Sequence, residues 1–235
     1  MKHPFFTVFL VAMFLLPLAL HAQPSHSLRQ DRLTATVAAQ TAAAADTYWS
    51  TPDAYGTPRI IKLARQGDVK TLLNLANYPL SGQFLLATDV YGNNLFHVAK
   101  NADTIHAVSS LLRHFYGAKA LQKITQLANA ANQLGERPLN AQINAAHADT
   151  FRPLYAYTTL KQKNDTARSQ LARLRGSDER LFVQHQNIYC QDIINASSAN
   201  GVTLLQAAQA QVPYHPQMAA VAAKISQVIP CLVQD

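Results

Sequence analysis

The stretch that decides the fold is Asp89-Val-Tyr-Gly-Asn-Asn-Leu-Phe-His97-Val-Ala-Lys-Asn-Ala-Asp-Thr-Ile-His-Ala-Val-Ser-Ser-Leu-Leu112. Near its start stand a glycine and two asparagines, Gly92 to Asn94, a composition that favours a tight turn. A short apolar segment follows, and after a second break the apolar residues recur at helical spacing. The stretch therefore predicts a turn, a short helix, a second turn and a second helix.

The same unit recurs along the chain at turn glycines, which stand at positions 56, 92, 135 and 201. Two short helices joined by a tight turn cannot bury their apolar faces alone, so they need neighbours of the same kind. The spacings of 36, 43 and 66 residues predict a degenerate unit between Gly135 and Gly201. They also predict extra residues near 115–126, which either lengthen a helix or form an inserted loop.

These units resemble ankyrin repeats, whose pattern is Asp-x-x-Gly-x-Thr-Pro-Leu-His-x-Ala, a turn, and a helix with Val-x-x-Leu-Leu. The second unit matches this pattern at Asp89, Gly92, His97, Ala99, Val108, Leu111 and Leu112. The third matches at Gly135, Pro138 and Leu139, and the last at Gly201, Thr203, Leu205 and Ala208. Asn94-Leu95 stands where the family has Thr-Pro, and we expect this departure to weaken the hydrogen bonding at the helix start.

The resemblance implies an all-α chain, with a short solenoid of about four to five stacked helix-turn-helix repeats over residues 55–235. It also implies that the His97 ring hydrogen-bonds to the backbone of the turns and does not bind a ligand. An Ala-rich helix near 28–45 and a loop, together residues 23–54, precede the repeats. We expect Trp49, with Tyr55, to cover the end of the first helical pair rather than to anchor a partner.

Residues 1–22 have the composition of a secretory signal peptide. Lys2 supplies the positive charge, Phe5 to Leu20 is apolar, and Ala22 precedes a cleavage site. The apolar run of about 16 residues is shorter than the roughly 20 that span a bilayer, which disfavours a membrane anchor. The sequence therefore predicts an exported protein, periplasmic or secreted, with no transmembrane segment in its mature chain.

The two cysteines, Cys190 and Cys231, both lie in the exported part of the chain. An oxidising compartment favours a disulfide between them, and the alternative is two buried free thiols. No His is paired with them, so the sequence does not predict a zinc site.

The net charge of +7 favours acidic partners, such as anionic lipid, cell-wall polymer or an acidic protein. We do not expect a nucleic-acid partner, because the signal peptide directs the chain out of the cytoplasm. The most charged segment carries a basic strip of six residues: Lys161, Lys163, Arg168, Arg173, Arg175 and Arg180. The strip is either a solvated helix face or a surface for an acidic partner.

The sequence holds no catalytic, metal or cofactor motif. It has no GxSxG elbow, no Walker loop and no dinucleotide fingerprint. Its histidines form no HExxH pair and have no carboxylate at ligand spacing. We therefore predict no enzyme, no metal and no cofactor, while a dispersed site of a hydrolase or secreted effector within residues 140–197 stays an alternative.

A repeat fold without a catalytic motif favours an exported protein-protein interaction module. Ankyrin-like stacks bind a protein partner through turn tips and the concave face, because each repeat adds a similarly oriented patch. The candidate binding residues are Tyr91, Asn93, Asn94, Gln133, Leu134, Glu136 and Arg137. The alternative is an accessory or structural component of a cell-envelope or secretion assembly, with weak association of the basic strip with the envelope surface.

Overall fold

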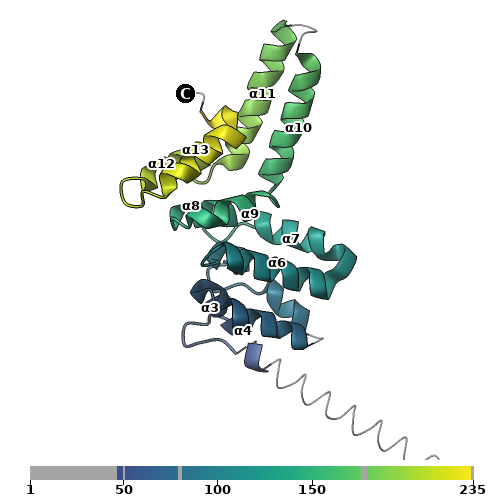
Figure 1. The fold of residues 1–235 in the computed structure, drawn as a ribbon, viewed down its shortest axis with the longest axis vertical. Helices are drawn as coiled ribbons and strands as arrows, with labels where there is room; N and C mark the ends of the chain where they lie inside the picture. Colours follow the sequence, from purple (N-terminus) through teal and green to yellow (C-terminus); the bar gives the residue numbers. More distant parts are fainter. Residues whose placement is uncertain (1–46, 50, 79–80, 176–178, 234–235) are drawn as a thin grey trace, which may run out of the picture. The chain divides into compact units, whose positions relative to one another are not determined.

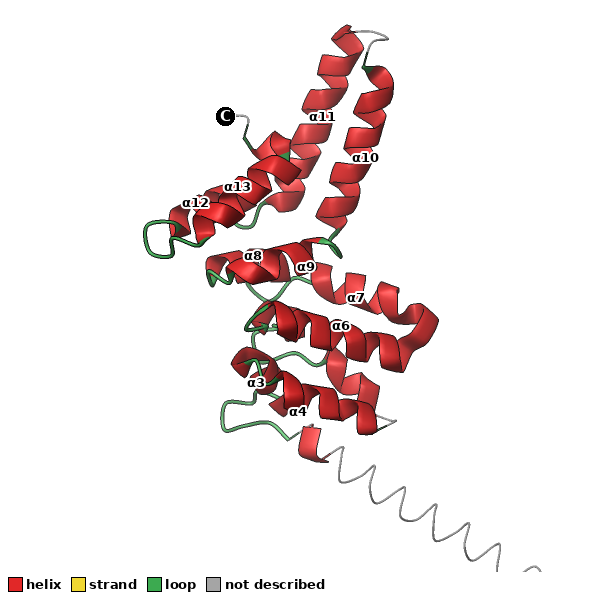
Figure 2. Cartoon of the chain, in the orientation of Figure 1, coloured by secondary structure: helices red, strands yellow, loops and turns green. Residues whose placement is uncertain are grey.

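The chain is seen in a computed structural model, which describes residues 47–49, 51–78, 81–175 and 179–233. The predicted signal peptide and the predicted helix near 28–45 lie outside these ranges. Within them the secondary structure consists of helices and isolated β-bridges, without an extended strand (Figure 2). This confirms the predicted all-α class. No helix in the described ranges is long and apolar enough to cross a membrane.

Most of the helices form consecutive pairs. The first two pairs are α3 (Arg59–Gln66) with α4 (Val69–Leu73), and α5 (Leu95–Val98) with α6 (Ala102–Tyr116). The next two are α8 (Pro138–Asn144) with α9 (Phe151–Tyr155), and α12 (Leu204–Gln211) with α13 (Met218–Val228).

The remaining helices connect or extend these pairs. The α-helices among them are α7 (Ala120–Asn129), α10 (Thr159–Leu174) and α11 (Glu179–Ser197). The 3-10 turns are η1 (Asn74–Asn77), η2 (Ser81–Leu86), η3 (Gly117–Lys119), η4 (Ala148–Thr150) and η5 (Pro230–Leu232).

The first helices of the pairs pack on one another in chain order. Helix α3 contacts α5, α5 contacts α8, and α8 contacts α12 (Figure 1). The second helices form a parallel series, since α4 contacts α6 and α6 contacts α9. Helices of four to eight residues are too short to be stable alone in water, so this packing holds them. The core accordingly runs between successive pairs, with Ile60, Leu72, Leu95, Phe96 and Leu112 fully buried.

The two irregular spacings have different structural causes. Of the extra residues near 115–126, the first two end α6, and the others form η3 and most of α7, which packs on α6. Between Gly135 and Gly201 the chain does not add the expected short unit. It forms a hairpin of two long helices, α10 and α11, that pack on each other, while α8 packs directly on α12. The hairpin is therefore an insertion between the third and fourth pairs.

Trp49 and Tyr55 have separate environments. Trp49 is 1% exposed and makes edge contacts with the rings of Tyr48 and Tyr78. Tyr55 is 84% exposed, so it covers nothing. The expectation of a covering role was wrong for Tyr55, and this side chain is available at the surface.

The two cysteines lie at disulfide distance, with 2.05 Å between the Sγ atoms of Cys190 and Cys231. The pair joins the middle of α11 to η5 near the C-terminus. Neither thiol is free. The predicted pairing of these cysteines is therefore present in the structure.

We predict that replacing both cysteines by serine lowers the free energy of unfolding by about 2–4 kcal/mol, since a cross-link over 41 residues restricts the unfolded chain. Urea unfolding of the mature chain with and without reductant measures the effect. Reductant should move the midpoint of the wild type and leave that of the Cys190→Ser, Cys231→Ser variant unchanged. Equal midpoints for the wild type and the variant without reductant would contradict the prediction.

Candidate functional site

The turn before α5 is built by the side chain of Asp89. Its Oδ1 atom accepts hydrogen bonds from the backbone N–H groups of Tyr91 at 3.0 Å and Asn93 at 2.9 Å. The Asp89 carbonyl accepts a third from Gly92 at 3.0 Å. Gly92 has φ +78°, a left-handed conformation that glycine adopts without steric cost. These bonds fix the turn as a rigid projection.

Two other turns repeat this construction. Asp53 Oδ1 accepts from the N–H groups of Tyr55 and Thr57, at 2.9 and 3.0 Å. Asn132 Oδ1 accepts from the second and fourth residues after it at 3.0 and 2.9 Å. The backbone hydrogen bonds from Thr57 and Tyr55 lower the pKa of Asp53 below its ordinary value. The acceptor at the start of each turn is therefore already engaged within the fold.

Neighbouring turns also bind one another. The Gln133 N–H donates to the Tyr91 carbonyl at 3.0 Å, and its Nε2 donates to the Val90 carbonyl at 2.9 Å. Asn132 Nδ2 donates to Asn93 Oδ1 at 2.9 Å. A Cβ atom added to Gly56 would lie 3.0 Å from a methyl carbon of Val90, so the first turn packs against the second. The three turns form one continuous edge.

Asn94 lies beneath this edge rather than on it. Its side chain is 1% exposed, and its Oδ1 accepts from the N–H groups of Phe96 and His97. Its Nδ2 donates to the Leu127 carbonyl at 2.8 Å. Asn94 therefore caps α5 fully, and the expected weakening at this helix start is wrong. Burial also removes Asn94 from the candidate binding surface.

His97 joins two consecutive turns. Its Nδ1 accepts the Asn94 N–H at 3.1 Å, so its Nε2 carries the ring hydrogen and donates to the Glu136 carbonyl at 3.0 Å. The structure thus supports the predicted role of His97 in holding turn backbone. Burial is the main cause that lowers its pKa, and the Glu136 carbonyl opposes the shift.

The large hydrophobic side chains exposed on this edge form a set that we call the tip row: Tyr55, Val90, Tyr91 and Leu134. Tyr55, Tyr91 and Leu134 are 84%, 64% and 68% exposed, and each immediately precedes its turn glycine. The turns present them because the backbone N–H groups of Tyr55, Tyr91 and Leu134 are hydrogen-bonded within their turns. The sequence pattern did not identify Tyr55 and Val90 as candidate binding residues, although Tyr55 stands directly before a turn glycine, Gly56.

The other candidate residues are partly used by the fold. Asn93 and Gln133 take part in the bonds between turns, and Gln133 stays exposed. Glu136 accepts from Asn144 Nδ2 at 2.8 Å. Arg137 Nη1 donates to the Ala196 carbonyl at 2.8 Å. Tyr91 and Leu134 are therefore the predicted candidates that a partner reaches most directly.

Helix α3, which follows the first turn, carries exposed positive charges. Arg59, Lys62 and Arg65 are its exposed cations. Arg65 pairs with Asp89 at 3.0 Å, but its side chain is 53% exposed while that of Asp89 is 1% exposed. The carboxylate is thus hidden and the cation is accessible, which favours an acidic partner on this surface.

The predicted basic strip does not occupy one face of its helix. Successive residues lie about 100° apart around a helix, so residues at seven-residue spacing share a side. The strip divides into Lys161 and Arg168 on one side of α10, Lys163 and Arg173 on another, Arg175 at the C-terminal cap of α10, and Arg180 on α11.

Part of the strip is engaged in contacts within the chain. Lys161 pairs with Asp165, and Arg168 donates to the Gln227 carbonyl at 3.2 Å. The other members of the strip are spread over a different side of α10, its C-terminal cap and α11. The strip is therefore not a continuous cationic surface.

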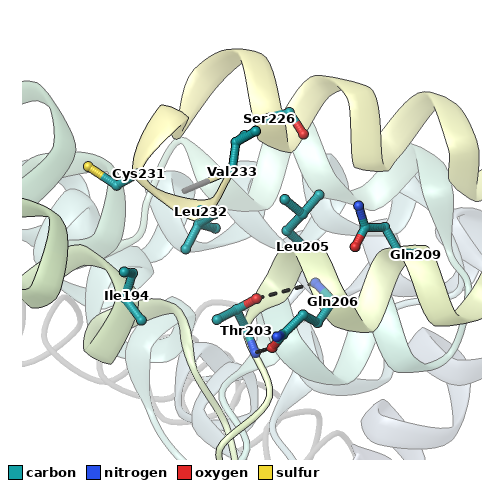
Figure 3. A pocket seen from close by; sticks show the side chains of 9 residues that line it. All are labelled: Ile194, Thr203, Leu205, Gln206, Gln209, Ser226, Cys231, Leu232 and Val233. Carbon is teal, nitrogen blue, oxygen red and sulfur yellow. Dashed lines mark hydrogen bonds between the residues drawn. The ribbon is translucent and has the colours of Figure 1, made fainter. Parts of the chain in front are cut away.

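A pocket of about 410 Å³ lies beside α12 and η5 (Figure 3). Its lining contains no charged residue and no His, and consists of Ile194, Thr203, Leu205, Gln206, Gln209, Ser226, Cys231, Leu232 and Val233. Thr203 and Gln206 are joined by the two hydrogen bonds that cap α12, drawn as dashed lines in Figure 3. The pocket thus offers neutral amides and hydroxyls, without an acid-base pair for catalysis.

The described ranges contain no group of three or more His, Cys, Asp and Glu residues placed to hold a metal ion. Comparisons with family models, with curated proteins and with solved structures find no match to this chain.

We predict that Asn94→Ala lowers the free energy of unfolding by about 1–3 kcal/mol, because it removes the cap of α5 and leaves the buried Leu127 carbonyl without its donor. Leu134→Ala is the matched control on the exposed side of the next turn, and should change stability by less than about 0.5 kcal/mol. Equilibrium urea unfolding compares them. A neutral Asn94→Ala variant would refute the scaffold role.

We predict that stability falls as the pH drops below about 6.5, the ordinary pKa of His. The folded state keeps the pKa of His97 below that of the unfolded chain, so the unfolded state binds a proton first and is favoured. The loss continues until the pH passes the pKa of folded His97. Urea unfolding between pH 7.5 and pH 5 measures it, and His97→Gln should show a shallower pH dependence. Equal slopes would contradict this assignment.

Proposed function

We propose that this protein is an exported interaction module whose four helix pairs are divergent ankyrin-like repeats. The support is the recurrence of one arrangement. A turn with a left-handed glycine precedes each pair, at Gly56, Gly92, Gly135 and Gly201. The first helices then pack in chain order from α3 to α12. The long α10–α11 hairpin interrupts the sequence of repeats without separating α8 from α12.

The tip row is the binding surface of this module. The observation that carries the proposal is that large apolar side chains stay exposed on turns whose backbone is tightly bonded within and between repeats. Aromatic anchors on a pre-organised backbone lose little conformational entropy when they bind. A contiguous exposed apolar set on an otherwise polar edge is typical of protein-protein contact sites.

The partner is an acidic protein. Arg59 and Lys62 are exposed on α3, and the guanidinium of Arg59 lies 4.0 Å from the ring centroid of Tyr48. The carboxylates of Asp53 and Asp89 are engaged by turn N–H groups. An accessible surface of this kind attracts negative charge and speeds the encounter.

The proposal assumes that the chain is exported from the cytoplasm. The sequence of residues 1–22 favours a signal peptide. The disulfide-distance pair of Cys190 and Cys231 is compatible with an oxidising compartment. We therefore place the partner in the periplasm or outside the cell.

We predict that Tyr91→Ala combined with Leu134→Ala weakens partner binding by more than about tenfold, because exposed aromatic and apolar anchors dominate such interfaces. The matched control combines Leu121→Ala and Tyr214→Ala, which remove equally exposed residues outside the tip row. The partner is captured from the exported fraction with the wild type and its affinity is then measured for each variant.

Retention of full affinity by the tip-row variant, or an equal loss in the control, would refute this surface. Binding to the wild type should also weaken as salt rises, because the partner is acidic.

A further inference from the structure

The α10–α11 hairpin has a groove along one face, with a volume of about 380 Å³. Its floor includes the buried residues Ala167 and Ile193. Lys163 on α10 and Asp192 on α11 are exposed and line its opposite sides. The groove exists because α10 contributes small side chains here, including Thr166.

The groove faces away from the contacts that anchor the hairpin. Asn164 Nδ2 donates to the Val228 carbonyl at 2.7 Å, and Arg168 donates to the Gln227 carbonyl at 3.2 Å. Both residues lie roughly 100–140° around α10 from Lys163, since successive residues are about 100° apart. The disulfide-distance Cys190 fixes α11 toward η5. The rest of the chain therefore holds one side of the hairpin and leaves the grooved side accessible.

Apolar side chains extend this grooved side along α11. Ile188 is 51% exposed and Leu181 is 44% exposed. They are seven residues apart, and Ile188 lies four residues before Asp192, so the three share one side of the helix. Half-buried Tyr189 lines the groove and stacks on His185, with 5.8 Å between the ring centroids. The grooved side thus carries apolar side chains along α11 and one cation and one anion at its proximal end. Arg173, seven residues after Thr166, adds a second cation farther along α10.

We propose that this face binds the same face of a second copy of the chain, so that two hairpins form a four-helix dimer. The charge arrangement selects this occupant. Lys163 and Asp192 line the same groove from different helices. A two-fold axis parallel to the helices places α10 of each copy over α11 of the other. Lys163 of each copy then meets Asp192 of the other, which is the reciprocity that a two-fold interface requires.

The area of this face indicates a small dimer interface. Helix α10 has 16 residues. Two helices about 24 Å long and about 10 Å apart offer roughly 500 Å² per copy, near the lower limit for a specific interface. An interface of this small size is typical of a reversible dimer, and we expect a dissociation constant within the micromolar range. Dimerisation would present two tip rows in one assembly, which raises avidity for a repeated partner.

Sedimentation equilibrium of the oxidised mature chain tests the dimer between about 1 and 200 µM, a range that brackets a weak interface. We expect the wild type to dimerise and Ile188→Asp to raise the dissociation constant at least about tenfold, because it buries a charge at the apolar contact. Val183→Asp is the matched control. Val183 is 49% exposed on α11 but lies roughly 140° around the helix from Ile188, so the dimer should persist.

A charge exchange tests the reciprocal pair and does not depend on the apolar contact. Lys163→Asp and Asp192→Lys each place like charges opposite one another in the dimer, and should weaken it about fivefold or more. The double variant restores opposite charges and should recover most of the wild-type affinity. Circular dichroism verifies that each variant keeps its helix content.

Three results would overturn the proposal: a wild type that stays monomeric throughout the range, equal effects of Ile188→Asp and Val183→Asp, or a double charge variant as weak as the singles. A monomer that instead binds an acidic helical peptide or anionic phospholipid vesicles through Ile188 would assign the groove to a different occupant. Tyr91→Ala with Leu134→Ala should leave dimerisation intact, so the result is independent of the tip-row function.

Discussion

The contact on which the rest of the structure depends is the link that His97 makes between consecutive turns. Its ring accepts the Asn94 N–H and donates to the Glu136 carbonyl, so one buried side chain sets the spacing of the second and third turns. The four-residue helix α5 has too few internal hydrogen bonds to persist alone. Bonds between neighbouring turns, with the packing of α3, α5, α8 and α12, supply what the short helices lack.

This construction also explains why the surface is suited to binding. The side-chain oxygens of Asp53, Asp89 and Asn132 accept hydrogen bonds inside the turns. The groups left for a partner are therefore chiefly the aromatic and aliphatic side chains of the tip row and basic side chains. The same bonds hold these groups still before binding. Rigidity and exposure therefore have one cause, and the proposed recognition of an acidic protein requires no movement of the helix pairs.

The sequence predicted best where the structure is decided locally. The turn at Asp89 to Gly92 and the role of His97 follow from turn chemistry, and the structure bears them out. The expectation for Asn94 was wrong because its amide acts both as a helix cap and as a donor to Leu127, which is 33 residues away. Likewise, the spacing between Gly135 and Gly201 correctly indicated that additional residues lie between these turns, but it did not predict the structure that these residues form. Long-range packing determines that α10 and α11 form an inserted hairpin, and no local pattern records it.

Amide hydrogen exchange at Gln133 tests the central claim most directly, because the N–H of this exposed residue donates across turns to the Tyr91 carbonyl. If the stacked turns form one rigid edge, this N–H exchanges at least about a hundredfold more slowly than in an unfolded chain. His97→Ala should remove that protection together with that of Asn94. Exchange of Gln133 at the unfolded rate in the wild type would contradict the account.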